Sequence, residues 1–467
     1  MRRRHTLMAA MCCLTPLALS APASAFCGFF VAKADTDLFN DASKVAMVRD
    51  GDRTVVTMAS NYRGEASEFA MVIPVVDVPE RDEIRVINQK IVDHLDSYTA
   101  PRLVEYHDPE PRCGVPFNAE LYKSGGGALQ NILITGARRQ SGRELQVKIE
   151  AEYEVGEYDI QILSARESGG LITWLNQEGY TIPDGAEEIV AAYLKRDMKF
   201  FVAKVALDRH DGEADLSPLQ IEYEDENFML PIRLGTVNAE GQQELFVFAL
   251  SRKGRVETAN YRTVKLPSDM DVPVYIKEEF GDFYKDMFRH QVKKEKGKAV
   301  FMEYAWDMNW CDPCAADPLS PSELASLGVN WVKKPQRIDR RTGDPLPFWK
   351  FWRLSDSYID NSPAVDAYVT RLHVRYDATT FPEDLQFQET GDRTNYQGRY
   401  VLRHEWRGDF GACEAKREYA NALVTRWDVE AKTLADITGR DISAIKATMI
   451  EKGYSDASLK SETIQTE

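Results

Sequence analysis

The chain has 467 residues, of which 43% are hydrophobic and 10% aromatic, and its formal net charge is −16. This composition can build hydrophobic cores, so it excludes a chain that is disordered throughout. The acidic balance argues against nucleic acid and against anionic membrane surfaces as partners, because both need a basic face.

The N-terminal segment, up to Ala25, has the features of a secretory signal peptide. Arginines occupy positions 2–4, an apolar run covers positions 7–19, and positions 23–25 read ASA, a sequence that signal peptidase accepts. Cleavage is expected near Ala25/Phe26, and the loss of three arginines shifts the formal charge from −16 to −19. No later apolar run has the length of a membrane helix. We therefore expect a soluble, acidic protein without a transmembrane anchor, which is periplasmic or secreted.

The part before residue 116 predicts a β-hairpin and a helix. Two β-rich runs within residues 43–62 flank Gly51, whose aspartate neighbours suit a tight turn. An amphipathic helix is expected over residues 87–98. Further strands are expected over residues 69–78 and 102–108.

The middle of the chain predicts a regular alternation of strands and short helices. Two strands, two helices and a third strand follow one another, and a charged helix comes after several more strands. The expected strands are 145–155, 158–165 and 199–207, and the expected helices are 168–179, 184–197 and about 278–296.

The last part contains further strands and ends in two helices. The first helix begins near residue 414 and is stopped by Gly439, and Asp441 caps the second. The expected fold class is α+β (mixed α/β), with antiparallel-rich sheets, flanking helices, a C-terminal helical hairpin and disulfide bridges. The predicted division is a signal peptide (1–25), an N-terminal β-hairpin plus helix region (26–115), a loop-rich connection (116–145), a central α/β region (146–300), a Cys/Trp-rich region with the C-terminal helices (301–454) and a flexible tail (455–467).

The usual sequence motifs of catalytic sites are absent. The chain lacks a Gly-x-Ser-x-Gly elbow, a His-Glu-x-x-His zinc motif, a Walker phosphate loop and an EF-hand loop. We therefore predict no catalytic residue, no metal ligand and no cofactor, and lean against an enzyme.

Cys311 and Cys314, in the stretch NWCDPC, allow three interpretations. A thiol–disulfide oxidoreductase is the first, but Pro318 and Pro321 oppose the uninterrupted helix that would activate the first thiol. A metal site is the second, but a structural zinc needs four ligands and no second Cys-x-x-Cys or paired His follows. Structural cross-linking is the third, and we favour it because an exported chain meets an oxidising compartment.

Five cysteines remain after the signal peptide, so one must lack a partner within the chain. Loop-closure entropy favours a long-range bridge, which we expect between Cys413 and either Cys311 or Cys314. Cys27 would then pair with Cys113, and the second cysteine of the Cys-x-x-Cys pair would be the odd thiol.

Tryptophans are concentrated in a short part of the third region. Five of the eight lie between positions 306 and 352, and such clusters form either ordinary cores or surfaces that contact a ligand or partner. A core is the more common outcome. If the cluster is functional, the contact residues are Trp306, Trp310, Trp331, Trp349 and Trp352.

Several long strings of the sequence, among them CGFFVAKADTDLFNDASKVAMVRDGDRTVVTMASNYRG, YDIQILSARESGGLITWLNQEGY and WCDPCAADPLS, are similar to a family of exported bacterial proteins known only as domain of unknown function 2330. The resemblance implies a soluble, signal-bearing envelope or secreted protein, and it brings no activity or site residue. It also implies that Cys311 and Cys314 belong to an architecture that the family shares.

The hypothesis from sequence is therefore an exported, non-enzymatic binding or scaffolding protein of the bacterial envelope, whose partner is an unknown envelope protein or ligand. The alternative is a thiol–disulfide oxidoreductase that uses Cys311 and Cys314.

Overall fold

The computed structural model describes residues 29–32, 39–63, 69–115, 117, 148–165, 167–180, 182, 185–206, 209, 216–238, 241–310, 316–332, 336–339, 358–361 and 365–455. Within these residues, no helix has both the length and the apolar composition that a membrane crossing requires.

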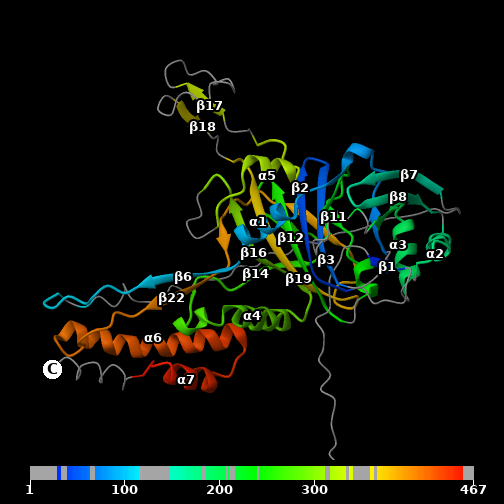
Figure 1. Cartoon of the computed structure of the whole chain (residues 1–467). Helices are drawn as coiled ribbons and strands as arrows, with labels where there is room; N and C mark the ends of the chain where they lie inside the picture. Colours follow the sequence, from blue (N-terminus) through cyan, green and yellow to red (C-terminus); the bar gives the residue numbers. More distant parts are fainter. Residues whose placement is uncertain are drawn as a thin grey trace, which may run out of the picture.

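Two large sheets lie face to face at the centre of the described protein (Figure 1). The nine-stranded central sheet has the order β14-β16-β19-β12-β2-β3-β10-β5, with β21 beside β16. The five-stranded outer sheet has the order β1-β4-β9-β8-β7. Their strands are β1 (Phe29–Ala32), β2 (Phe39–Asp50), β3 (Arg53–Arg63), β4 (Phe69–Val75), β5 (Ile84–Val86), β7 (Lys148–Val155), β8 (Tyr158–Ser164), β9 (Lys199–Val205), β10 (Leu219–Glu224), β12 (Gln243–Ser251), β14 (Arg262–Lys265), β16 (Ala299–Asp307), β19 (Tyr368–Tyr376) and β21 (Tyr396–Gln397).

Eight shorter strands form three small sheets. The orders are β11-β20-β13, β15-β22-β6 and β17-β18. The strands are β6 (Arg102–His107), β11 (Met229–Leu230), β13 (Val256–Thr258), β15 (Met270–Asp271), β17 (Gln336–Asp339), β18 (Tyr358–Asn361), β20 (Leu385–Glu389) and β22 (Arg399–His404).

The two-residue alternation of a strand gives the central sheet two different apolar faces. On β12, Leu245 and Val247 belong to the core between the two large sheets. Phe248 and Leu250 belong to a second core, on the side covered by helices. The central strands are therefore buried on both faces, which explains their nearly continuous apolar sequences.

The described helices cover the outer faces of both sheets, which gives four layers. Helices α2 and α3 pack on the outer sheet, whereas α1 and α5 and α4 pack on the central sheet. Helix α6 packs on α4 and beside the small β15-β22-β6 sheet, and α7 packs on α6 (Figure 1). The α-helices are α1 (Gln89–Thr99), α2 (Ser168–Gln177), α3 (Ala186–Leu194), α4 (Phe280–Lys294), α5 (Pro321–Ser326), α6 (Glu414–Thr438) and α7 (Ile442–Glu451), and the 3₁₀ helices are η1 (Arg81–Glu83), η3 (Leu234–Asn238) and η4 (Val274–Lys277).

A disulfide joins two loops that lie far apart in the sequence. Strands β6 and β22 run in parallel, with Arg102 opposite Arg399 and His107 opposite His404. The loop after β6 therefore lies close to the segment that leads from β22 into α6. Cys113 in that loop is bonded to Cys413, the residue before α6, and their Cα atoms are 5.8 Å apart.

This bond corrects the pairing that we expected from the sequence. Cys413 pairs with Cys113, and neither Cys311 nor Cys314 pairs with Cys413. The pairing of Cys27 with Cys113 was also wrong. The physical reason is the parallel pairing of β6 with β22, which brings Cys113 close to Cys413. An argument from loop-closure entropy considers only the length of the loop and does not predict which strands pair. Cys27, Cys311 and Cys314 lie outside the described residues.

Most of the predicted elements are confirmed, and so is the α+β class. Gly51, with φ of 64°, turns the β2–β3 hairpin. Gly439 ends α6, and the Asp441 side chain caps α7 by accepting a hydrogen bond from the Ala444 N–H. The central sheet takes strands from all three predicted regions. The loop-rich connection, apart from residue 117, lies outside the described residues.

Candidate functional site

Three of the five clustered tryptophans lie in the described part of the chain. Trp306 on β16 is half-buried, and its ring stacks 5.9 Å from that of Tyr304. Its indole N–H donates to the Trp310 carbonyl at 3.1 Å, and the Trp310 side chain is 68% exposed. The structure therefore brings these two residues together, while Trp349 and Trp352 lie outside the described residues.

Trp331 is fixed by two contacts of its own. Its indole N–H donates to the Asp366 carbonyl at 2.7 Å, and the Arg252 guanidinium lies 4.8 Å from the ring centroid. Cation–π contacts of this kind stabilise a partly exposed ring in place. Its role as a contact residue stays a prediction.

A buried charge network lies on the helix-covered face of the central sheet. The Glu303 side chain is fully buried and accepts hydrogen bonds from Arg371 Nε at 2.5 Å and from the Tyr284 hydroxyl. His373 Nδ1 lies 2.7 Å from Glu303 Oε1, and its Nε2 lies 2.9 Å from Glu244 Oε2. Strands β12, β16 and β19 and helix α4 thus meet at one ionic cluster.

A β-bulge aims Glu303 into this network. The register between β16 and β19 shifts between Met302 and Tyr304. The extra residue lets Glu303 and Tyr304 both face the helices, although they are adjacent in the sequence.

The charges of the network maintain one another. Burial opposes the charge on Glu303, but Arg371 and His373 outweigh it and hold the pKa of Glu303 below its ordinary value. Burial also opposes the charge on His373, yet Glu303 and Glu244 raise the pKa of that imidazole. Burial would raise the pKa of Glu244, but its partners His373 and Arg375 lower it to about 2.

We interpret this network as one that stabilises the fold. Perturbed pKa values also occur in active sites, but the surroundings of His373 do not suit catalysis. Both ring nitrogens of His373 already face carboxylates, and the ring is stacked between Phe288, at 3.7 Å, and Phe246, at 4.2 Å. A general base needs a nitrogen that can reach the substrate. His373 offers none in this arrangement.

A second buried cluster lies between α6 and the β6–β22 pair. Arg426 Nη1 donates to Asp108 Oδ2 at 2.6 Å, and the Tyr419 hydroxyl donates to the same oxygen at 2.7 Å. Glu430 is 1% exposed, and its Oε1 lies 3.5 Å from Arg426 Nε. Burial raises the pKa of Glu430 to about 8, although Arg426 opposes this shift. At neutral pH this carboxyl group is therefore mostly protonated.

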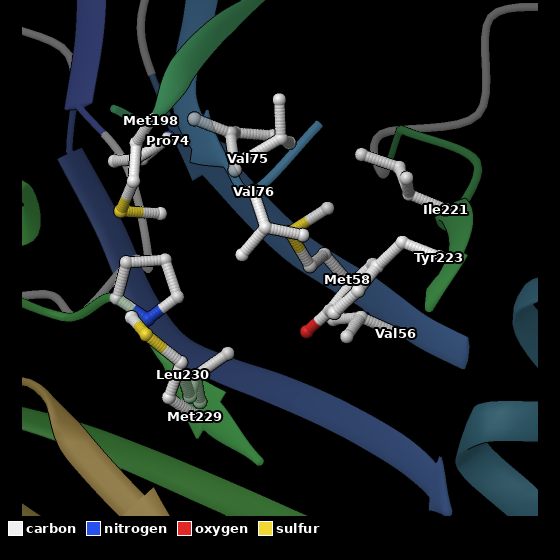
Figure 2. Close-up of a pocket in the computed structure, with 12 residues that line it drawn as sticks. Val56, Met58, Pro74, Val75, Val76, Met198, Ile221, Tyr223, Met229 and Leu230 are labelled. Atoms are coloured by element: carbon white, nitrogen blue, oxygen red, sulfur yellow. The ribbon is translucent and has the colours of Figure 1, made fainter. Parts of the chain in front are cut away.

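A narrow apolar crevice lies between the two large sheets. Figure 2 shows Met58, Met198 and Met229 around it, together with Tyr223 and aliphatic side chains. Its volume is about 30 Å³, which leaves room for only about one or two water molecules. We interpret the crevice as a packing seam, with methionines that adapt to an irregular gap.

A larger hollow lies on the outer face of the outer sheet, where the helical cover ends. Leu163 and Phe200 of this face are buried under α2 and α3. Further along the same strands the outward-facing positions are polar except for Val202, and they are aligned in rows across β7, β8 and β9. These polar residues are Glu152, Glu154, Asp159, Gln161 and Lys204.

The end of α2 and the residues that follow it also line the hollow. Gly179, with φ of 88°, ends the helix, and the Tyr180 N–H bonds to the Leu175 carbonyl at 3.0 Å. This is the hydrogen bond of a Schellman motif, which fixes the chain as it leaves the helix. Half-buried Trp174 and exposed Glu178 are thereby held at the rim.

The hollow has a volume of about 370 Å³, which is within the range of small-molecule sites. Gln161 donates to Glu152 Oε1 at 2.7 Å. Arg209 pairs with Asp159, and its Nη1 lies 4.0 Å from Glu154. We call this hollow the acidic groove. It is lined by Glu152, Glu154, Asp159, Gln161, Trp174, Glu178, Tyr180 and Lys204, together with Tyr153, Ile160 and Val202.

Sequence reasoning did not single out the acidic groove. Its strand residues alternate with apolar ones, as on any half-exposed sheet, and that pattern alone indicates a solvated face. The sequence feature that could have indicated the groove is the pair Glu152 and Glu154, which is followed along the chain by a helix that carries Trp174. Among the described residues, no group of three or more His, Cys, Asp or Glu side chains is placed to hold a metal ion.

The fold and the groove define an α+β protein with a polar, ligand-sized hollow. The chain belongs to the family described as uncharacterized protein conserved in bacteria (DUF2330), whose match covers residues 21–388. The matched range confirms the resemblance and contains every residue of the acidic groove. The description gives no activity, and nothing in it indicates a thiol–disulfide oxidoreductase.

No curated protein matches the chain. Among solved structures, a mutated baculovirus P35 after caspase cleavage, determined at 3.1 Å resolution, is 11% identical, and the match covers 46% of this chain and 67% of that chain with a TM-score of 0.25. A TM-score this low does not establish a common fold, so this likeness carries no argument.

Proposed function

We propose that this protein is an exported ligand-binding protein of the bacterial envelope and that the acidic groove is its binding site. The observation that carries the proposal is the groove itself. It combines a volume of about 370 Å³ with side chains from three strands and a helix end. Small-molecule sites have volumes in this range, and convergent polar groups in them orient the ligand.

Export is supported by two observations. The N-terminal segment that ends at Ala25 has the arrangement of a signal peptide. The bond between Cys113 and Cys413 fits a compartment in which disulfides persist, such as the periplasm or the cell exterior. Neither observation depends on the groove, so export and ligand binding are tested separately.

A groove-blocking variant tests the binding site. Gln161 is half-buried in the middle of the groove, and Gln161→Trp would fill it. Gln177→Trp adds the same side chain at an exposed position of α2 that does not line the groove, and it is the matched control. Thermal unfolding is followed against defined sugars, amino acids, amines and dicarboxylates, since a ligand that binds only the folded state raises its stability.

We expect at least one of these probes to raise the melting temperature of the native protein and of Gln177→Trp but not of Gln161→Trp. A probe that stabilises all three proteins equally would bind elsewhere and would refute the assignment of the site. The complete absence of stabilisation in the native protein would refute it as well.

We propose a second contact region, for a protein partner, which consists of Trp306 and Trp310. It is supported by Trp310, whose side chain is 68% exposed beside half-buried Trp306. Exposed aromatic side chains of this kind are often central to protein interfaces. Trp310→Ala should abolish cross-linking to envelope proteins without unfolding the protein, and unchanged cross-linking would rule this surface out.

A further inference from the structure

We propose that the acidic groove takes an alkyl diamine, a flexible organic cation with an ammonium group at each end. This inference rests on the proposed function and gives the groove a ligand class. It follows from the charge, the aromatic wall and the spacing of the carboxylates.

The first argument is charge. Glu152, Glu154, Asp159 and Glu178 bring four carboxylates to the groove. Two cations stand against them, Lys204 in the lining and Arg209 beside Asp159. The groove therefore has an excess of negative charge, and a cationic ligand would be attracted to it.

The second argument is the wall. Trp174 is half-buried and lines the same groove as the carboxylates. An indole face attracts an ammonium group by the cation–π interaction and also packs against methylene groups. A carboxylate beside an indole can therefore bind both the charge and the carbon chain of an alkyl amine.

The third argument is spacing. Glu152 and Glu154 are two residues apart on β7, so their Cα atoms are about 7 Å apart. Glu178 comes from a different element, the end of α2. A calcium ion needs six to eight oxygens within about 2.6 Å, and among the described residues no three acidic, histidine or cysteine side chains are placed to hold a metal ion. Spread carboxylates suit a molecule with two separated positive charges.

The fourth argument is that parts of the groove are held in place before a ligand binds. The Gln161 amide holds Glu152 through a hydrogen bond of 2.7 Å. The turn after Gly179 holds the end of α2, which carries Glu178. The Glu152 carboxylate and the backbone that carries Glu178 are thus positioned before a ligand arrives, which lowers the entropy lost on binding.

The test is calorimetric titration of the full chain with three molecules of similar length. The probes are 1,5-diaminopentane, its neutral analogue 1,5-pentanediol and the dianion glutarate. We expect only the diamine to bind, with an affinity that falls at least tenfold when sodium chloride is raised from about 20 to 300 mM, because exposed ion pairs are screened by salt.

The variants Glu152→Gln and Glu178→Gln should each weaken binding of the diamine at least fivefold. Glu224→Gln is the control, because Glu224 is an exposed carboxylate on β10 of the other sheet. Each variant is first checked for an unchanged melting temperature. Trp174→Leu supplies a second test that removes no charge, and it should weaken binding of the diamine but leave the salt dependence.

Three results would overturn the proposal. The diol or glutarate could bind in the groove as tightly as the diamine, which would leave the binding function standing and refute the cationic class. The diamine could bind the two groove variants as tightly as Glu224→Gln, which would refute the site. Calcium could displace the diamine at equal concentration, which would make the groove a metal site. A lysine tripeptide that binds more tightly than the diamine would support the ammonium chemistry and identify a protein side chain as its source.

Discussion

Cys113 is bonded to Cys413 across a sequence separation of 300, and this bond joins the loop after β6 to the start of α6. The two cysteines lie at the end of the parallel β6–β22 pair, which packs beside α6 (Figure 1). The family match ends at residue 388, so the bond connects the matched region to the part of the chain that follows it.

Removing this bond should lower the stability of the protein. We expect Cys113→Ser to reduce the free energy of unfolding by about 2–5 kcal/mol, because a long closed loop restricts the unfolded chain. Urea unfolding of the oxidised proteins measures the difference. Cys413→Ser should have the same effect, and the double variant should lose no more than either single variant. Equal stability of Cys113→Ser and the native protein would show that the bond does not form.

The buried network should be sensitive to the loss of one charge. In Glu303→Gln, Arg371 and His373 stay buried with only part of their compensating charge, and breaking a buried pair costs about 3–5 kcal/mol. Guanidinium unfolding at pH 7 should detect this difference. Glu224→Gln, on an exposed position of the same sheet, should change the stability by less than about 0.5 kcal/mol. Similar midpoints for the two variants would contradict the structural role of Glu303.

The sequence predicted local structure well because local structure follows from periodicity and turn residues. Gly51, Gly439 and Asp441 each act within a few residues, and each has the predicted role. The disulfide and the acidic groove depend on which distant strands become neighbours. Strand β6 pairs with β22, which lies in the last part of the chain, and no local pattern encodes that choice. The groove likewise lies where α2 and α3 no longer cover the outer sheet. The extent of that cover depends on how the helices pack on the sheet, and no local sequence pattern specifies it.

The tryptophans of the proposed contact surface should differ in their structural importance. Trp310 is 68% exposed, so Trp310→Ala should change the free energy of unfolding by less than about 0.5 kcal/mol. Trp306 is half-buried against Tyr304, and Trp306→Ala should cost about 2 kcal/mol because it removes packed aromatic surface. Thermal and urea unfolding of both variants decide the matter. A larger loss in Trp310→Ala than in Trp306→Ala would reverse the assignment of surface and core.

Glu430 should make the stability depend on pH in the direction opposite to that of an ordinary carboxylate. Burial raises the pKa of Glu430 to about 8 in the folded protein, against a usual value of 4.5. The folded state therefore keeps a proton that the unfolded chain has lost. The resulting stability is fully present below pH 4.5 and is lost as the pH rises towards 8, which amounts to a few kcal/mol.

Glu430→Gln removes this dependence, because a neutral amide has nearly the same shape and carries no charge. The pKa of His373 is also raised, so its contribution also declines as the pH rises above its folded value. For this reason the measured quantity is the difference in free energy of unfolding between Glu430→Gln and the native protein, determined by urea unfolding at several pH values from 5 to 9. We expect Glu430→Gln to gain stability relative to the native protein as the pH rises. Glu418→Gln, at an exposed position of the same helix, should show a constant difference. A constant difference for Glu430→Gln as well would mean that this carboxyl group is ionised in the folded protein at neutral pH.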